Sequence, residues 1–105
     1  MKSINDINEF YELTDQPKPI LLDFYADWCG PCQTLMPTVE KISHEFQDDI
    51  EVRKVNVDQN RELATKFGVR SIPSLFFLKG DKILDRTVGL VTTNTLIEKV
   101  NNMIS

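Results

Sequence analysis

A nearly continuous apolar run from Ile20 to Ala26 constrains the fold of this chain more than any other segment. Pro17 and Pro19 precede the run, and Asp23 is the single charged residue inside it. A run of this length bounded by breakers is typical of a strand covered on both faces, such as the central strand of a parallel sheet. We therefore expect this segment at the centre of the sheet.

Strand and helix patterns alternate along the rest of the chain. Strands are predicted at residues 2–4, 51–57, 75–79 and 83–88, the last two joined by a turn at Gly80 and Asp81. Apolar spacing predicts helices that begin at Asn5 or Asp6, at Asn60, and at Thr92 or Thr95, and a long helical pattern that follows Cys32. The last helix would bury Leu96, Ile97, Val100, Met103 and Ile104, and Thr95 with Glu98 fits a capping box. This order predicts one α/β domain over residues 1–105, a three-layer sandwich with a central mixed sheet flanked by helices.

Size, charge and apolar content exclude several classes of protein. The chain has 105 residues, the size of one domain, and its 41% hydrophobic and 27% charged residues are typical of a globular protein. Its net charge of -4 argues against a general nucleic-acid binder, which would be basic. No apolar run approaches the ~20 residues of a membrane helix, and the polar start of the chain lacks the apolar region of a secretory signal. We expect neither a nucleic-acid nor a membrane partner.

The only two cysteines, Cys29 and Cys32, lie where the apolar strand gives way to a helix. Helical residues three apart have Cα atoms roughly 5–6 Å apart, which suits an unstrained disulfide. Cys29 would face the unpaired backbone N–H groups at the helix start, which favour a thiolate, and Pro31 suits the first turn. Cys32 would lie one turn deeper and be less exposed. The hypothesis is that Cys29 attacks and Cys32 resolves.

The cysteine pair could also be half of a zinc site or a purely structural disulfide. Structural zinc sites usually need four Cys or His ligands, whereas this chain adds only His44, in a charged helical segment, to its two cysteines. A structural disulfide that closes so short a loop would constrain the unfolded chain little. We therefore expect a redox-active disulfide and no metal.

Five stretches of the sequence together resemble the thioredoxin family. They are residues 22–32 around the cysteines, Met36–Pro37, Lys54–Asp58, Phe67–Ser74 and Val88–Gly89, in the family's order along nearly the whole chain. The resemblance implies the thioredoxin fold and a cytoplasmic protein-disulfide reductase. We expect a monomer with no bound cofactor. A thioredoxin reductase would reduce it with electrons from NADPH, and it would reduce disulfide-containing proteins.

The resemblance also implies roles for residues around the cysteines. Gly30 and Pro31, between the cysteines, resemble those of reducing members of the family. Asp23 matches a buried aspartate that helps to deprotonate the resolving thiol, although as a strand residue it could also be exposed at a sheet edge. Lys54 matches a lysine that modulates the ionisation of this aspartate, although a strand lysine often only extends to the rim.

The same resemblance implies a docking surface for substrates. Ile72 and Pro73 match a turn beside the active site with a cis peptide bond, in which the Ile72 backbone is open to an extended substrate. With Trp28, Val88 and Gly89 these residues would form an apolar patch around Cys29, although a Trp is more often in a core. Two positions depart from the commonest family pattern. They are Tyr25, where a second Trp is frequent, and Gln33, where Lys is frequent.

Two alternative functions remain within the same fold. The chain could be a binding subunit that uses only the apolar patch, but such a protein has no need of both cysteines and Asp23. It could also be an oxidase or isomerase, although those proteins more often carry a histidine between the cysteines. A redox potential would separate the oxidase from the reductase.

Overall fold

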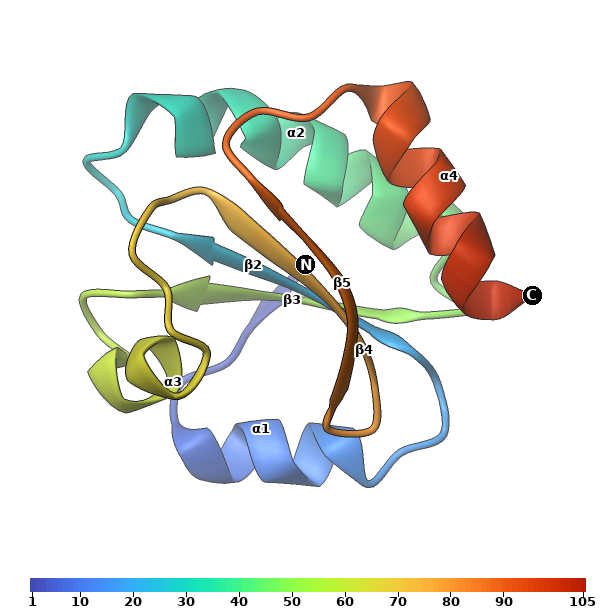
Figure 1. Cartoon of the computed structure of the whole chain (residues 1–105), viewed down its shortest axis with the longest axis horizontal. Coiled ribbons are helices and arrows are strands. Elements are labelled where there is room, and N and C mark those ends of the chain that lie inside the picture. Colours follow the sequence, from blue (N-terminus) through green and yellow to red (C-terminus); the bar gives the residue numbers. More distant parts are fainter.

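The computed structural model describes all residues from 1 to 105, which form a single five-stranded sheet with helices on both of its faces (Figure 1). In chain order the elements are β1 (Lys2–Ser3), α1 (Ile7–Thr14), β2 (Ile20–Tyr25), α2 (Gly30–Glu45), β3 (Glu51–Asn56), α3 (Arg61–Lys66), β4 (Ser74–Lys79), β5 (Lys82–Val88) and α4 (Thr93–Ile104). The strands lie in the order β1-β3-β2-β4-β5. None of the four helices has the length and apolar character that a membrane span requires.

The central position belongs to β2, whose six residues are all buried. It pairs in parallel with β3 and antiparallel with β4, so the sheet is mixed. In this register Asp23 lies beside Lys54 on one neighbouring strand and beside Leu75 on the other. The prediction of a central strand covered on both faces is confirmed.

Each face of the sheet carries its own apolar core. On one face α1 and α3 pack over residues such as Phe24 and Phe76, and on the other face α2 and α4 pack over residues such as Leu21 and Phe77 (Figure 1). Alternation of side chains along β2 therefore sends Leu22 and Phe24 to the first face and Leu21 to the second. The predicted α/β/α sandwich is confirmed.

Local sequence decides where two of the helices begin. The Asp6 carboxylate accepts the N–H of Glu9 at 2.9 Å and caps α1, as one of the two predicted N-caps. In α4 the cap is Thr92, whose hydroxyl accepts the N–H of Thr95 at 3.1 Å. The capping box of Thr95 with Glu98 is therefore wrong, because α4 already begins at Thr93.

Other boundaries differ from the prediction at the ends of elements. Ile104, expected inward, is 42% exposed because it is the last residue of α4 and has no element beyond it to pack against. Asn60 is the N-cap residue of α3, but its side chain donates to the Asn56 carbonyl oxygen at 3.0 Å instead of capping the helix. The first strand is shorter than predicted and ends at Ser3.

Candidate active site

The two cysteines form a disulfide at the point where β2 leads into α2. Cys29 is the N-cap residue of α2, with extended backbone angles, and Cys32 lies in the first helical turn. Their Cα atoms are 5.3 Å apart, inside the range in which a disulfide forms without backbone movement. The same backbone can therefore hold the pair either oxidised or reduced.

The helix start is well suited to a negative charge on Cys29. The backbone N–H of Cys32 points at the Cys29 sulfur from 3.2 Å, and the positive end of the helix dipole adds to this attraction. Cys29 is 5% exposed and Cys32 is 1% exposed, so an incoming group meets Cys29 first. Gly30 and Pro31 between them lie at the surface. Charge and access thus distinguish Cys29 from Cys32.

Asp23 is buried in the sheet, and its exposure at a sheet edge is ruled out. It is 1% exposed, and neither of its carboxylate oxygens has a hydrogen-bond partner in the protein. Burial raises the pKa of Asp23 from 3.8 to about 7, against the opposing charge of Lys54, which lowers it. Side chains alternate along β2, so Asp23 points to the same face as Leu21, the face covered by α2 and the cysteine-bearing turn.

Lys54 is half-buried beside Asp23 in the pairing of β2 with β3. Its ammonium nitrogen lies 5.8 Å from the centre of the Tyr25 ring, within the range of a cation–π interaction. Tyr25 packs in a small cluster with Ala26 and the two cysteines. Lys54 thus lies close enough to Asp23 to act on its ionisation. The Tyr25 ring that it contacts stands at the position where a second Trp is frequent in the family.

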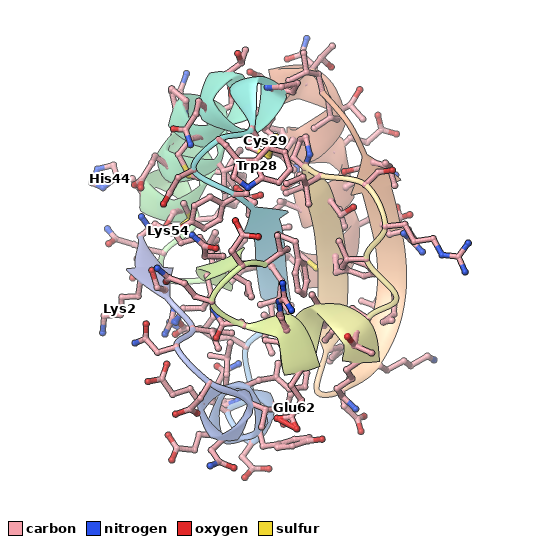
Figure 2. The ribbon with its side chains drawn as sticks, turned by 90° about the vertical axis from the view of Figure 1, so that its left-hand side faces the viewer. Lys2, Trp28, Cys29, His44, Lys54 and Glu62 are labelled. Atoms are coloured by element: carbon pink, nitrogen blue, oxygen red, sulfur yellow. A yellow bond between two sulfur atoms is a disulfide. The ribbon has the colours of Figure 1, made fainter.

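The side chain of Trp28 lies on the surface beside Cys29 (Figure 2). It is 73% exposed, so a role in the core is wrong. Its indole N–H donates to the carboxylate of Asp58 at 2.8 Å. This hydrogen bond fixes an otherwise free aromatic ring next to the disulfide. Sequence reasoning missed the contact, because the two residues are far apart in the chain and are joined only by the fold.

The turn before β4 closes the other side of the site. The carbonyl oxygen of Ile72 lies 3.8 Å from the Cys29 sulfur, and the bond between Ile72 and Pro73 is cis, as the resemblance implied. Pro73 is buried, and its carbonyl oxygen accepts the N–H of Gly89 at 2.8 Å. Val88, 54% exposed, completes this side. The structure therefore brings all five predicted docking residues to one end of the sheet.

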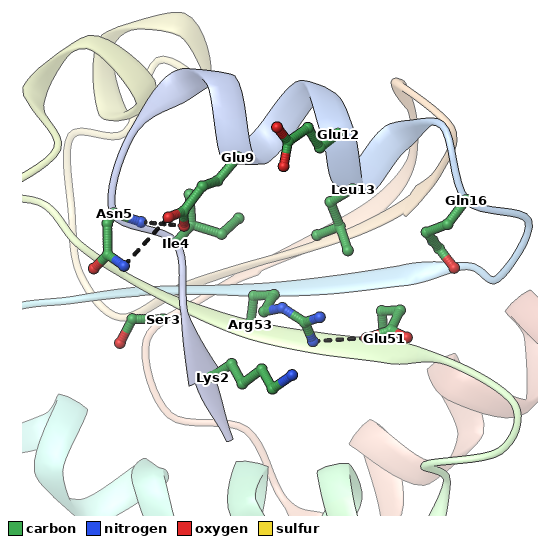
Figure 3. Close-up of a pocket in the computed structure, with 10 residues that line it drawn as sticks. All are labelled: Lys2, Ser3, Ile4, Asn5, Glu9, Glu12, Leu13, Gln16, Glu51 and Arg53. Atoms are coloured by element: carbon green, nitrogen blue, oxygen red, sulfur yellow. Dashed lines mark hydrogen bonds and ion pairs between the residues drawn. The ribbon is translucent and has the colours of Figure 1, made fainter.

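Three hollows of the surface lie away from the disulfide. The largest, of about 630 Å³, is formed by β1, α1 and the start of β3 and shares no residue with the cysteine site (Figure 3). Some of its polar groups have partners within the chain: Arg53 pairs with Glu51 at 2.7 Å, and the backbone N–H of Asn5 donates to Glu9 at 2.8 Å. No group of three or more His, Cys, Asp or Glu side chains could hold a metal ion.

Comparison with known proteins agrees with this geometry. The family model of thioredoxin matches residues 2–102. The chain belongs to the thioredoxin family. It is 36% identical to a thioredoxin of Rickettsia typhi over 99% of both chains, and 44% identical to thioredoxin 1 of a Nostoc species over 81% of this chain and 79% of the relative.

Solved structures of thioredoxins are also similar to this chain. A thioredoxin of Malassezia sympodialis superposes with a TM-score of 0.91 at 30% identity, over all of this chain and 91% of the other. One of Fasciola hepatica gives 0.90 at 33% identity, over 98% and 99% of the two chains. Family, fold and cysteine pair make this protein a thiol-disulfide oxidoreductase of the protein-disulfide reductase type. A thioredoxin works in general with a reductase and with disulfide-containing substrates.

Reduction of the disulfide is expected to raise the fluorescence of Trp28, the only tryptophan. A disulfide quenches an excited indole at contact range, and Trp28 directly precedes Cys29. The measurement is a titration with dithiothreitol followed at the indole emission. A Cys29→Ser, Cys32→Ser double variant is the control and should not respond. An unchanged intensity in the native protein would show that the indole does not sense the sulfur pair.

Proposed function

We propose that this protein reduces disulfides of other proteins in the cytoplasm, with Cys29 as the attacking and Cys32 as the resolving thiol. The observation that carries the proposal is the position of Cys29 at the N-cap of α2, where the N–H of Cys32 points at its sulfur. A thiolate is stabilised there relative to a thiol in water. Cys32, more deeply buried, is reached only by a group already bound to the protein.

The reaction runs in two exchange steps. The Cys29 thiolate attacks one sulfur of the target disulfide; a bond forms between Cys29 and the target, and the second target sulfur leaves as a thiolate that takes up a proton. Cys32 then loses its proton and attacks the Cys29 sulfur. The disulfide of the protein forms, and the first target sulfur leaves and is protonated. Two electrons and two protons have passed to the target.

Asp23 is proposed as the group that receives the proton of Cys32 in the second step. A base acts best when its pKa lies near the working pH, and burial brings the pKa of Asp23 to about 7. Lys54, beside it in the sheet, modulates this value because its positive charge favours the ionised carboxylate. Both residues are positioning or proton-handling groups and form no bond with the target.

The docking of an extended target segment is proposed along Ile72. Ile72 lies outside the strands, and neither its N–H nor its carbonyl oxygen has a backbone hydrogen-bond partner. Both groups are therefore free to pair with a target as one strand pairs with another. Trp28, Pro73, Val88 and Gly89 surround this position and offer apolar contact. The segment would lie directly over the Cys29 sulfur, because this sulfur is 3.8 Å from the Ile72 carbonyl oxygen.

The oxidised protein is proposed to be recycled by thioredoxin reductase with electrons from NADPH. The protein would thus act as an electron carrier, without a bound cofactor of its own. A cytoplasmic location fits a cysteine pair that must be kept reduced, since secreted domains of this size more often carry several disulfides. The monomeric state fits a site whose residues all come from one chain.

A coupled assay tests this function. Oxidation of NADPH in the presence of thioredoxin reductase and insulin should depend on this protein and stop in the Cys29→Ser, Cys32→Ser double variant. The redox potential of the cysteine pair should lie at the reducing end of the family. A potential at the oxidising end would assign the protein to the oxidases, and full cellular activity of the double variant would make it a binding subunit.

A further inference from the structure

A small apolar cavity adjoins Trp28 and Ile72. Its volume is about 170 Å³, and its walls are formed by Trp28, Val57, Val69, Arg70 and Ile72. Pockets for free small molecules are usually of about 300–1,000 Å³. The size and the apolar walls suit one apolar side chain of a bound polypeptide rather than a separate ligand.

Arg70 is the only charged residue among these walls. It is exposed, and it takes part in no ion pair of the structure. Two aspartates also lie next to Trp28. Asp27 precedes it in the chain, and Asp58 is hydrogen-bonded to its indole. The cavity therefore has one free cation at its edge and apolar groups inside.

The open backbone of Ile72 determines how far the target residue near Arg70 is from the reacting target cysteine. Arg70 is two residues from Ile72, at most about 7 Å along the backbone, so a target side chain that reaches it belongs to a residue about two positions from the one across from Ile72. The Cys29 sulfur lies 3.8 Å from the Ile72 oxygen, so the reacting target cysteine has to lie at or next to the residue across from Ile72. A side chain near Arg70 is then within three positions of that cysteine.

We propose that Arg70 makes the protein selective for target segments with an apolar residue and an acidic residue within three positions of the reacting cysteine. The apolar side chain enters the cavity beside Trp28, and the carboxylate pairs with Arg70. This rests on the proposed docking along Ile72. The net charge of -4 repels acidic targets at long range, so selectivity for them has to come from contact with Arg70.

Peptide substrates with one altered residue test this selectivity. Each peptide has a leucine beside a cysteine that is held as a mixed disulfide with 2-mercaptoethanol, and either Glu or Lys two positions from the cysteine, on either side. Single-turnover reduction by the dithiol protein is followed by mass spectrometry at low ionic strength. For one of the two placements we expect the Glu peptide to react about twofold to fivefold faster than the Lys peptide, the range for an exposed ion pair.

Variants at Arg70 separate local contact from overall charge. Arg70→Gln should abolish the preference, Arg70→Glu should reverse it, and Arg70→Lys should keep most of it. Arg61→Gln is the matched control, because it removes an exposed arginine that does not line the cavity. An unchanged preference in Arg70→Glu, or an equal change in Arg61→Gln, would overturn the proposal.

A second substrate distinguishes this proposal from the function on which it rests. The peptide rates of each variant are divided by its rate with 2-hydroxyethyl disulfide, because that substrate is uncharged and has no segment to dock. Loss of this activity in the native protein would contradict the reductase itself. A second copy of the chain in the cavity would instead appear as a dimer that Arg70→Glu dissociates in sedimentation, and it would overturn the assignment to targets.

Discussion

Replacing Cys32 with serine is expected to turn the protein into a trap for its own targets. Cys29 keeps its position at the N-cap of α2 and still attacks. The resolving step is lost, because no second thiol is within reach. Well-oriented intramolecular reactions have effective molarities on the order of 10⁵ M or more, so external thiols at millimolar concentration replace Cys32 only slowly. Covalent complexes should therefore accumulate to nearly the full amount of protein.

Non-reducing electrophoresis and mass spectrometry measure this trapping. After mixing with a disulfide-containing target, Cys32→Ser should run as an adduct that dithiothreitol releases. Cys29→Ser is the matched control and should form little adduct, because Cys32 is only 1% exposed. Alkylation of the reduced native protein at neutral pH gives an independent check. Faster labelling of Cys32 than of Cys29 would reverse the two roles.

Much of the chemistry could be predicted because it depends on short-range sequence. The position of Cys29 at a helix start follows from one strand, two cysteines and a proline, all within 13 residues. The burial of Asp23 follows from its apolar neighbours along β2. In both cases the local pattern favours one arrangement, and the structure has it.

The contacts across the site could not be predicted in the same way. Trp28 donates a hydrogen bond to Asp58, and Arg70 lines the apolar cavity beside the indole. Both contacts arise because β2, β3 and the turn before β4 lie at the same edge of the sheet. The sequence alone does not indicate that these side chains come into contact. The start of α4 is ambiguous in the sequence because Thr92 and Thr95 are both good N-caps, and in the structure Thr92 is the cap.

Replacing Asp23 with alanine is expected to stabilise the protein at neutral and alkaline pH. The folded pKa of about 7 lies above the unfolded value of roughly 3.9. Below about pH 3.9 the carboxyl group is protonated in both states and carries no penalty. As the pH rises from about 4 to 7, the unfolded chain loses its proton first, and the free energy of unfolding falls. Each pKa unit between the folded and unfolded values corresponds to about 1.4 kcal/mol, so the free energy of unfolding is lower by about 4 kcal/mol at pH 8.

The alanine variant escapes this loss and is destabilised only by the missing side-chain atoms. The small cavity costs about 1 kcal/mol at every pH, so the net gain at pH 8 should be about 3 kcal/mol. Near pH 4 the gain should vanish, because the native carboxyl group is then largely protonated in the fold. If Asp23 handles the proton of Cys32, the same variant should also be slower in the second exchange step.

Denaturant unfolding of the oxidised proteins at pH 4 and pH 8 decides between burial and pairing of Asp23. Asp48→Ala is the control, because it removes one exposed carboxylate and should leave the difference between the two pH values as it is in the native protein. An Asp23→Ala variant less stable than the native protein at pH 8 would mean that the carboxylate is well solvated or fully paired. A group of that kind has no reason to hold a proton near neutral pH, and the proton transfer from Cys32 would then need another acceptor.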